Sequence, residues 1–234
     1  MEKKINQIKK AAFELNVDLV KHGLVTLTWG NASVVDRDLG VFAIKPSGVP
    51  YNKLKWQDMV LVDLSGSIME FSLKPSSDTA THVEIYRGFN EVNAIIHTHS
   101  TWATIWAQAA KSIPALGTTH ADHFSGEIPC LPYLDHKKVS EGYEQETGRQ
   151  IVQFYRQNKI CYFEVPACIL AGHAPFVWGM NPSQAITNAV ALERTAMMAY
   201  HSILINNKIT FPVYILEKHF CRKHGKGATY GQGN

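Results

Sequence analysis

Residues 93–108 read NAIIHTHSTWATIWAQ, an apolar run that leads into two histidines one position apart. The run Ala94–Ile96 predicts a buried strand, and alternate residues of a strand point to the same face of a sheet. His97 and His99 would then lie side by side, within reach of one bound metal ion. The stretch therefore predicts a central strand with a candidate metal site at its end.

A third histidine that could complete this site lies in the stretch PACILAGHAPFVWG, residues 166–179. His173 follows an apolar run that predicts a strand, and we expect it at the strand end, facing a cavity. Catalytic zinc sites typically have three protein ligands and one open position. His97, His99 and His173 fit this pattern, although each single histidine also fits an ordinary hydrogen-bonded core residue.

Other zinc-site patterns do not fit these residues. A metallo-hydrolase of the H-x-H-x-D-H type requires Asp and His where this chain has Thr101 and Trp102. A cupin-type site requires an acidic residue shortly after the second histidine, and none occurs there. A closed structural site would use thiolates, but no cysteine lies close in sequence to the paired histidines. The pattern favours an open site with three histidines.

The hydrophobic pattern along the chain predicts a mixture of helices and short strands. Apolar residues from Ile5 to Leu19 repeat with a helical spacing, and Gly23 would end that helix. Asn181 followed by Pro182 predicts the start of a long apolar helix. We expect further helices at 76–89 and 140–158, strands at 24–29, 40–46, 58–64 and 166–173, and a strand that runs from Ala94 into the paired histidines. Because no repeat or long linker interrupts the chain, the sequence predicts one layered α/β domain over residues 1–234.

Composition places this 234-residue chain among ordinary globular proteins, with 45% hydrophobic and 18% charged residues. Its formal net charge of +3 is too small to indicate nucleic-acid binding. No apolar stretch approaches the ~18 residues that would span a membrane, and the charged N-terminus lacks the pattern of a signal peptide. The four cysteines show no disulfide spacing, so we expect a reducing, cytoplasmic environment.

Three short polar segments could bind an anion such as a phosphate. Ser76 and Ser77 precede a predicted helix, whose N-terminal amides attract anions, and Asp78 follows them. Two further loops supply Lys45, Ser47 and Gly48 in one case, and Gly30 and Asn31 in the other. Each segment alone also fits an ordinary cap or turn. The chain has no phosphate-loop or dinucleotide fingerprint, which disfavours nucleoside triphosphates and dinucleotides as ligands.

Two residues are candidates for proton transfer. Asp122 lies in the loop GTTHADHFSG, residues 117–126, between two histidines. Tyr230 lies in the C-terminal stretch GATYGQ, and an ordinary tyrosine pKa near ~10 would make it a proton donor at neutral pH. In isolation, Asp122 also fits a solvated loop carboxylate, and Tyr230 also fits an aromatic residue that packs on the protein or on a neighbour.

These motifs occur together, and in the same order, in one known family. The chain resembles the L-ribulose-5-phosphate 4-epimerases of the class II sugar-phosphate aldolase/epimerase family in the stretches LVTLTWGNAS, VFAIKPSGV, PSSDTATH, IIHTHS, ATIWAQ, IPALGTTHAD, HAPFVWG and KHFCRKHG…YGQ. The resemblance runs from near the N-terminus to the last residues. It implies a three-layer α/β/α fold around a mostly antiparallel sheet, and a homotetramer with active sites between subunits.

The resemblance also implies roles for individual residues. The expected ligands of zinc, or of another divalent transition metal, are His97, His99 and His173, with Asp78 at or beside the ion. Asp122 would transfer one proton and Tyr230, reaching in from the adjacent subunit, would transfer the other. The residues expected to bind the substrate and its phosphate are Gly30, Asn31, Lys45, Ser47, Gly48, Ser76 and Ser77.

The chain departs from the family pattern at two positions. Many members have glycine after the third histidine, where this chain has Ala174. If that position requires a left-handed backbone, alanine would be unfavourable there. Paired tyrosines commonly precede the final Gly–Gln, whereas Thr229 precedes Tyr230 here, which leaves one candidate for a proton donor in the tail.

The activity that the resemblance implies is interconversion of L-ribulose 5-phosphate and D-xylulose 5-phosphate, which differ in configuration at C4. Because the C4 hydrogen is not acidic, the C3–C4 bond would break and re-form in a retro-aldol and aldol sequence. One alternative is a class II aldolase that acts on a deoxyketose 1-phosphate; such aldolases tend to have Glu where this chain has Asp78. Another alternative is a protein that binds zinc or a sugar phosphate without catalysis.

Overall fold

The computed structural model of the chain describes residues 1–70, 73–224 and 228–229. Its centre is a seven-stranded sheet in the order β3–β2–β1–β4–β7–β6–β5. The strands are β1 (Asn31–Asp36), β2 (Val41–Ile44), β3 (Val60–Asp63), β4 (Ala94–His97), β5 (Cys130–Leu131), β6 (Ala167–Leu170) and β7 (Pro175–Gly179). Neighbouring strands are antiparallel except for β5 and β6, which are parallel. The prediction of an α/β fold around a mostly antiparallel sheet is confirmed.

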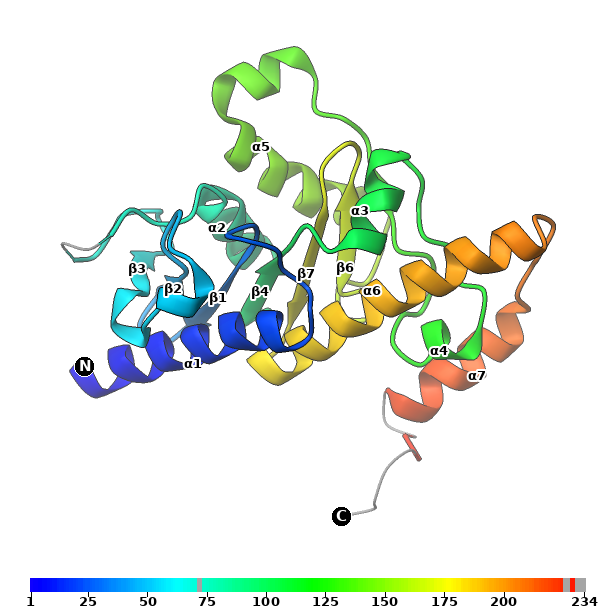
Figure 1. Ribbon diagram of the computed structural model, residues 1–234, viewed down its shortest axis with the longest axis horizontal. Helices are drawn as coiled ribbons and strands as arrows, with labels where there is room; N and C mark the ends of the chain where they lie inside the picture. The colour runs from blue at the N-terminus through cyan, green and yellow to red at the C-terminus, as the bar shows by residue number, and fades with distance from the viewer. Residues whose placement is uncertain (71–72, 225–227, 230–234) are drawn as a thin grey trace.

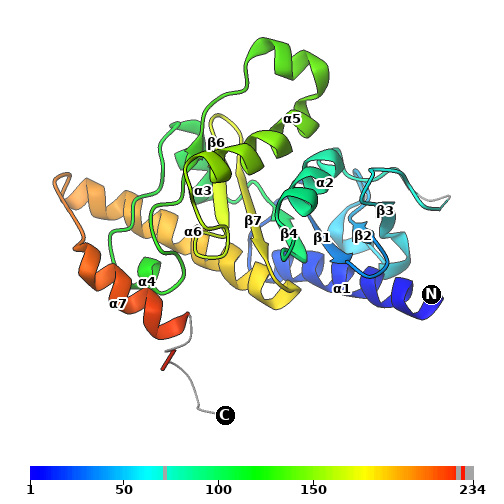
Figure 2. The same cartoon turned by 180° about the vertical axis from the view of Figure 1, so that it is seen from behind.

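Helices cover both faces of this sheet, as the two opposite views show (Figure 1 and Figure 2). The helices are α1 (Glu2–Lys21), α2 (Thr79–Gly88), α3 (Thr101–Gln108), α4 (Thr118–Ala121), α5 (His136–Gln157), α6 (Pro182–Ile205) and α7 (Val213–Lys223), with 3-10 turns at Tyr51–Lys53 and Trp56–Asp58. α1, α3 and α6 pack on one face, α2 and α5 pack on the other, and α7 packs against α4. The chain therefore has the three predicted layers. None of the helices in its described part has the length and hydropathy needed to cross a bilayer.

The central strands are buried on both faces because helices cover each side. Along β4, Ala94 and Ile96 enter the hydrophobic cluster beside α1 and α6, while Ile95 enters the cluster beside α2 and α5. β2 alternates in the same way, with Ala43 in the first cluster and Phe42 in the second. Strands that are buried on both faces have continuous apolar sequences. This explains why the runs at β2, β3 and β4 predict strands correctly.

The predicted strand at 24–29 is wrong. This segment is a loop in which the amide of Trp29 donates to the carbonyl of Thr26 at 3.0 Å, and Leu27 has a φ of 54°. The strand begins only after Gly30, whose φ is 95°. A Cβ on Gly30 would lie 2.8 Å from the carbonyl oxygen of His97. Glycine therefore allows the chain to enter the sheet close beside β4.

The helix boundaries differ modestly from those that the sequence predicts. α2 begins at Thr79 rather than at the preceding serines, and α5 begins at His136, several residues earlier than expected, with a break at Gly142. The predicted start of α6 is confirmed. The side chain of Asn181 accepts a hydrogen bond from the amide of Gln184 at 2.9 Å, which satisfies one of the free amides of the first turn.

Replacing Gly148 with alanine is expected to destabilise the fold where α5 packs on α2. A Cβ on Gly148 would lie 2.8 Å from the carbonyl oxygen of Thr81 and 2.6 Å from Cβ of Glu84. Because overpacking typically costs about 1–3 kcal/mol, urea unfolding should show a free energy of unfolding reduced by that amount. Gly126→Ala is the control, since nothing lies within 4 Å of its added Cβ. Equal stability of the two variants would contradict the close approach of these helices.

Candidate metal centre

His97 is the last residue of β4 and is buried. Its Nδ1 lies 2.9 Å from the carbonyl oxygen of Pro175, the first residue of β7. Because a carbonyl only accepts hydrogen bonds, Nδ1 carries the ring proton and Nε2 keeps a free lone pair. The ring also stacks on Phe176, with centroids 4.3 Å apart. The neighbouring strand thus fixes both the orientation and the tautomer of His97, as in metal-binding histidines.

His99 lies beyond the end of β4, in the short segment that leads into α3. The strand stops at His97, so the predicted placement of both histidines on one strand face is wrong. The two rings are nevertheless close, with centroids 5.1 Å apart. The ring of His99 also lies 6.5 Å from the ring of Trp29, which is half-exposed. His99 therefore reaches the same place as His97 by a different backbone route.

His173 lies in the turn of the hairpin that β6 and β7 form, rather than at the end of a single strand as predicted. Its amide donates to the carbonyl of Leu170 at 2.9 Å, and the amide of Gly172 donates to the carbonyl of Ala107 at 2.8 Å. The left-handed backbone in this turn falls on Gly172, with a φ of 70°, and not on Ala174. The alanine that departs from the family pattern therefore introduces no backbone strain.

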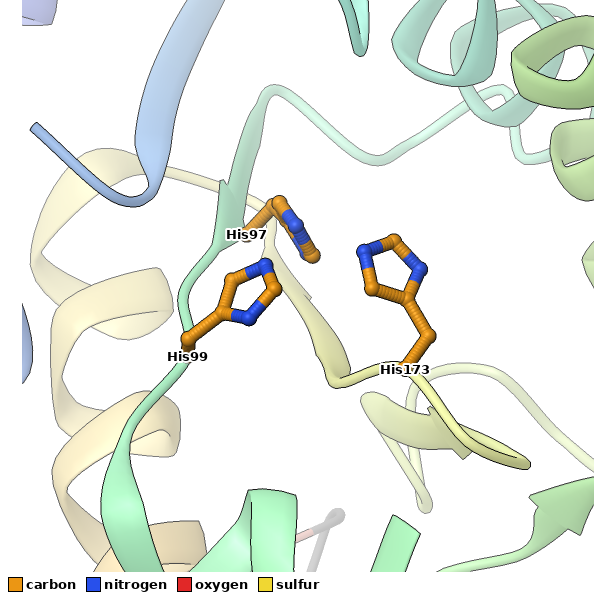
Figure 3. Close-up of side chains that lie close together, drawn as sticks. All are labelled: His97, His99 and His173. Carbon is orange, nitrogen blue, oxygen red and sulfur yellow. The ribbon is translucent and has the colours of Figure 1, made fainter. Parts of the chain in front are cut away.

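The three histidines converge on one point although they come from a strand end, a linker and a hairpin turn (Figure 3). One ring nitrogen from each lies within 4.8 Å of the others, and the ring centroids are 4.9 to 5.1 Å apart. Burial and the neighbouring histidines lower the pKa of His173 to about 4, and burial also lowers the pKa of His99. Neutral imidazoles offer lone pairs to a cation. The cluster therefore fits a divalent transition metal, zinc among others.

Asp78 lies beside this cluster, at the N-cap position of α2. Its Oδ2 accepts a hydrogen bond from the side-chain amide of Asn31 at 2.7 Å and lies 3.9 Å from Nε2 of His97. Burial alone would raise the pKa of Asp78, but the charge interaction with His97 and the bond from Asn31 help to lower it. The carboxylate is therefore ionised, and it places a negative charge at one side of the three imidazoles.

A cavity of about 470 Å³ opens next to the histidines. It brings together the residues that the sequence predicts for metal and phosphate binding, from segments far apart in the chain. The lining residues are Gly30, Asn31, Lys45, Ser47, Gly48, Ser76, Ser77, Asp78, His97, His99 and His173, together with Thr28, Trp29 and Pro46. The last three are absent from the predicted set, although each lies within a motif that supplied other members.

Lys45 gives this cavity a cationic wall. Its side chain is buried, and its ammonium lies 3.3 Å from the carbonyl oxygen of Pro46 and 4.8 Å from the ring centroid of Tyr51. No carboxylate of the described residues lies within ion-pair distance of it, and burial lowers its pKa. A buried ammonium without a counter-charge is unfavourable unless an anion arrives to pair with it.

Backbone hydrogen bonds join the two loops that flank this lysine. The amide of Ser47 donates to the carbonyl of Lys74 at 2.9 Å, and the amide of Ser76 donates to the carbonyl of Lys45 at 3.1 Å. These two amides are therefore not available to a ligand. Two others have no partner in the described part of the chain, those of Gly48 and Ser77. An anion in this cradle would use these free amides and the serine hydroxyls.

Asp122, one of the two residues predicted to transfer protons, does not line the cavity of its own chain. Asp122 follows α4, and its carboxylate accepts hydrogen bonds from Arg222 at 2.9 Å and from His219 at 3.0 Å, both in α7. Lys223 lies 3.4 Å away. Burial would raise the pKa of Asp122, but the bonds from Arg222 and His219 lower it. Asp122 is thus an ionised member of a basic cluster, and Tyr230 lies outside the described residues.

One contact near the cluster has no signal in the sequence. The hydroxyl of Tyr143, in α5, lies 3.3 Å from Nδ1 of His173. The two residues are 30 positions apart, so no motif or spacing rule connects them. Only the packing of α5 beside the β6–β7 hairpin reveals this neighbour.

Comparison with known proteins gives one family and several related folds. Residues 10–200 match the family described as Class II Aldolase and Adducin N-terminal domain. An L-fuculose 1-phosphate aldolase is 23% identical, with a TM-score of 0.75 over 91% of this chain and 94% of that one. L-fuculose-1-phosphate aldolase from Thermus thermophilus is 25% identical, with a TM-score of 0.67 over 86% and 98%. YgbL from Escherichia coli, described as a candidate aldolase, epimerase or decarboxylase, is 22% identical, with a TM-score of 0.71 over 92% and 98%.

The His99→Asn variant is expected to lose its metal site while keeping its fold, because it removes one of three converging imidazoles. We expect the affinity for Zn²⁺ to fall by more than roughly 100-fold. This loss is larger than the loss caused by removing a residue that only hydrogen-bonds to a metal ligand. Competition with a chromophoric chelator measures this affinity. His136→Asn, at an exposed histidine outside the cluster, is the control. If both variants bind zinc like the wild type, the ligand assignment is wrong.

Proposed function

The chain belongs to the Class II Aldolase and Adducin N-terminal domain family, and from this premise we propose that it is a metal-dependent L-ribulose-5-phosphate 4-epimerase. One observation carries the proposal: three converging histidines and a buried lysine line the same cavity, and no carboxylate of the described residues pairs with that lysine. Such a cavity suits a small sugar phosphate, with the carbonyl end at the histidines and the phosphate at Lys45. Zinc is the proposed ion, and the cytoplasm the proposed compartment.

We assign phosphate binding to the two joined loops. Lys45 would supply the positive charge, and the free amides of Gly48 and Ser77 would donate hydrogen bonds, together with the hydroxyls of Ser47 and Ser76. Charge-assisted hydrogen bonds of this kind are about twice as strong as neutral ones. Asn31 and Gly30 line the same cavity, and we propose that they contact the body of the sugar.

Epimerisation at C4 requires a route that avoids removing the C4 hydrogen, because that hydrogen is not acidic. Breaking the C3–C4 bond produces glycolaldehyde phosphate, which can turn, expose its other face and add back with inverted configuration. A divalent ion held by His97, His99 and His173 would supply the positive charge that stabilises the enediolate fragment. The phosphate loops would hold the aldehyde fragment through this turn, so that it re-adds before it escapes.

The proton transfers are assigned to Asp122 and Tyr230. The C4 hydroxyl must lose a proton on one side and regain one on the other, so two groups on opposite sides are required. Asp122 does not line the cavity of its own chain, and its participation therefore needs a second copy. We propose a homotetramer in which each active site lies between subunits.

The second candidate is a class II aldolase that cleaves a deoxyketose 1-phosphate and releases both fragments. It is favoured by the two L-fuculose 1-phosphate aldolases among the similar structures. The epimerase is favoured by Asp78, since the aldolases that the chain resembles tend to have Glu there. A protein that binds zinc or a sugar phosphate without catalysis would need neither Asp122 nor Tyr230, and we rank it last.

Zinc-loaded protein is expected to convert L-ribulose 5-phosphate into D-xylulose 5-phosphate. Removing the metal with a chelator should abolish this conversion, and adding zinc back should restore it. The product can be followed by ¹³C NMR. In a parallel assay, L-fuculose 1-phosphate should release no lactaldehyde. Lactaldehyde release without epimerisation would replace the proposal with the aldolase. Zinc binding without turnover of either ketose phosphate would favour the non-catalytic binding protein.

The Lys45→Met variant is expected to weaken binding of phosphorylated substrate while leaving the fold intact, since methionine has a similar length and suits a buried position. Loss of a charged hydrogen bond typically costs about 1.5–3 kcal/mol, so KM should rise roughly 10- to 100-fold. Lys74→Met, at an exposed lysine of the adjoining loop, is the control. A KM for Lys45→Met equal to that of the control would remove Lys45 from the phosphate site.

A further inference from the structure

The helical path of α5 breaks at Gly142, one residue before Tyr143. Gly142 has a φ of 152° and a ψ of 85°, a conformation that side-chain-bearing residues rarely adopt. Nothing lies within 4 Å of the place where a Cβ would be, so the backbone angle, and not a lack of space, is what requires glycine. The part of α5 before this break stands away from the body of the molecule (Figure 1).

The break directs Tyr143 toward the metal centre. Its hydroxyl lies 3.3 Å from Nδ1 of His173, and the two ring centroids are 6.0 Å apart. Figure 3 shows the other nitrogen of His173 facing the rings of His97 and His99. The tyrosine therefore approaches His173 from the side opposite to the ion that the cluster would hold.

The two histidines at this edge of the sheet are held in different ways. Nδ1 of His97 is bonded to the backbone carbonyl of Pro175 at 2.9 Å, a partner that no side-chain substitution removes. In the described part of the chain, the hydrogen-bond partner of Nδ1 of His173 is the side chain of Tyr143. The turn itself is braced elsewhere, by the amide of Gly172 bonded to Ala107.

We propose that Tyr143 is a positioning residue that holds the ring of His173 in the orientation needed for metal binding. In the metal-binding form, Nδ1–H of His173 donates to the hydroxyl oxygen of Tyr143, which leaves the lone pair of Nε2 for the ion. The opposite tautomer would place a proton on Nε2 and block ligation. The inference rests on the proposed function only in requiring that the cluster binds a metal; it does not depend on which sugar phosphate is used.

The test compares Tyr143→Phe with Tyr133→Phe. Tyr133 packs its ring against Gly172 in the same turn, so both variants lose one hydroxyl near His173 and keep their aromatic rings. Tyr133 makes no hydrogen bond to a cluster histidine in the described structure. Chelator competition should show zinc affinity about 10- to 100-fold weaker in Tyr143→Phe and unchanged in Tyr133→Phe. The visible absorption bands of the cobalt-loaded protein should shift only in Tyr143→Phe, because they report the ligand field directly.

The other outcomes either contradict the positioning role or separate it from the proposed function. Equal zinc affinity and equal cobalt spectra for Tyr143→Phe and the wild type would overturn it. Equal losses in the two variants would show that packing of the hairpin, and not the hydrogen bond, is responsible. If wild-type protein binds zinc tightly but converts neither ketose phosphate, the proposed function fails while the positioning role is still decided by these affinities. A wild-type protein that binds no metal overturns both.

The role of Gly142 is tested by a double-mutant cycle. If the glycine acts by directing Tyr143, then Gly142→Ala should weaken zinc binding in the wild-type background and have little further effect in the Tyr143→Phe background. Thermal unfolding of the metal-free variants shows whether the fold is retained. Additive losses of zinc affinity would contradict this route of action.

Discussion

The hydrogen bond from Nδ1 of His97 to the carbonyl of Pro175 ties the end of β4 to the start of β7, and the geometry of the candidate metal centre depends on it. The register of three central strands surrounds this bond, with Asn31 opposite His97 on one side and Phe176 opposite it on the other. A shift of one residue would turn every side chain of a strand to the opposite face. The site is therefore a direct product of strand register, and Gly30 permits that register by leaving room beside the carbonyl of His97.

The sequence predicts correctly those helices and strands whose conformation is determined by residues within the element itself. Runs that are apolar on both faces predict β2, β3 and β4, and the Asn181–Pro182 pair predicts the start of α6. The segment 24–29 has the same apolar character as a strand, but a turn and the left-handed backbone at Leu27 take it out of the sheet. Its conformation is set by how Gly30 meets β4, a long-range contact that no local pattern contains.

The candidate site divides in the same way. The histidines and the two polar loops that line the cavity could be predicted because each lies in a compact motif. Their meeting, however, depends on long-range bonds such as that from Ser47 to Lys74. The sequence predicts which histidines meet, but it does not predict where they lie in the fold. His99 lies past the end of its strand, and His173 lies in a turn. No sequence pattern predicts that Tyr143 lies beside His173, because a tyrosine on a helix becomes its neighbour only through tertiary packing. Asp122, held by α7, lies outside the cavity of its own chain.

The short turn between β6 and β7 contributes twice to the same centre, since His173 is one of its residues and the carbonyl that orients His97 belongs to Pro175 at its far end. Adding or deleting a single amino acid there would displace His173 and release the orientation of His97 at once. Protein engineers who wish to change substrate preference should therefore leave the length of this turn untouched. Half-exposed Trp29 also borders the cavity, and it can be replaced without altering any of the three histidines.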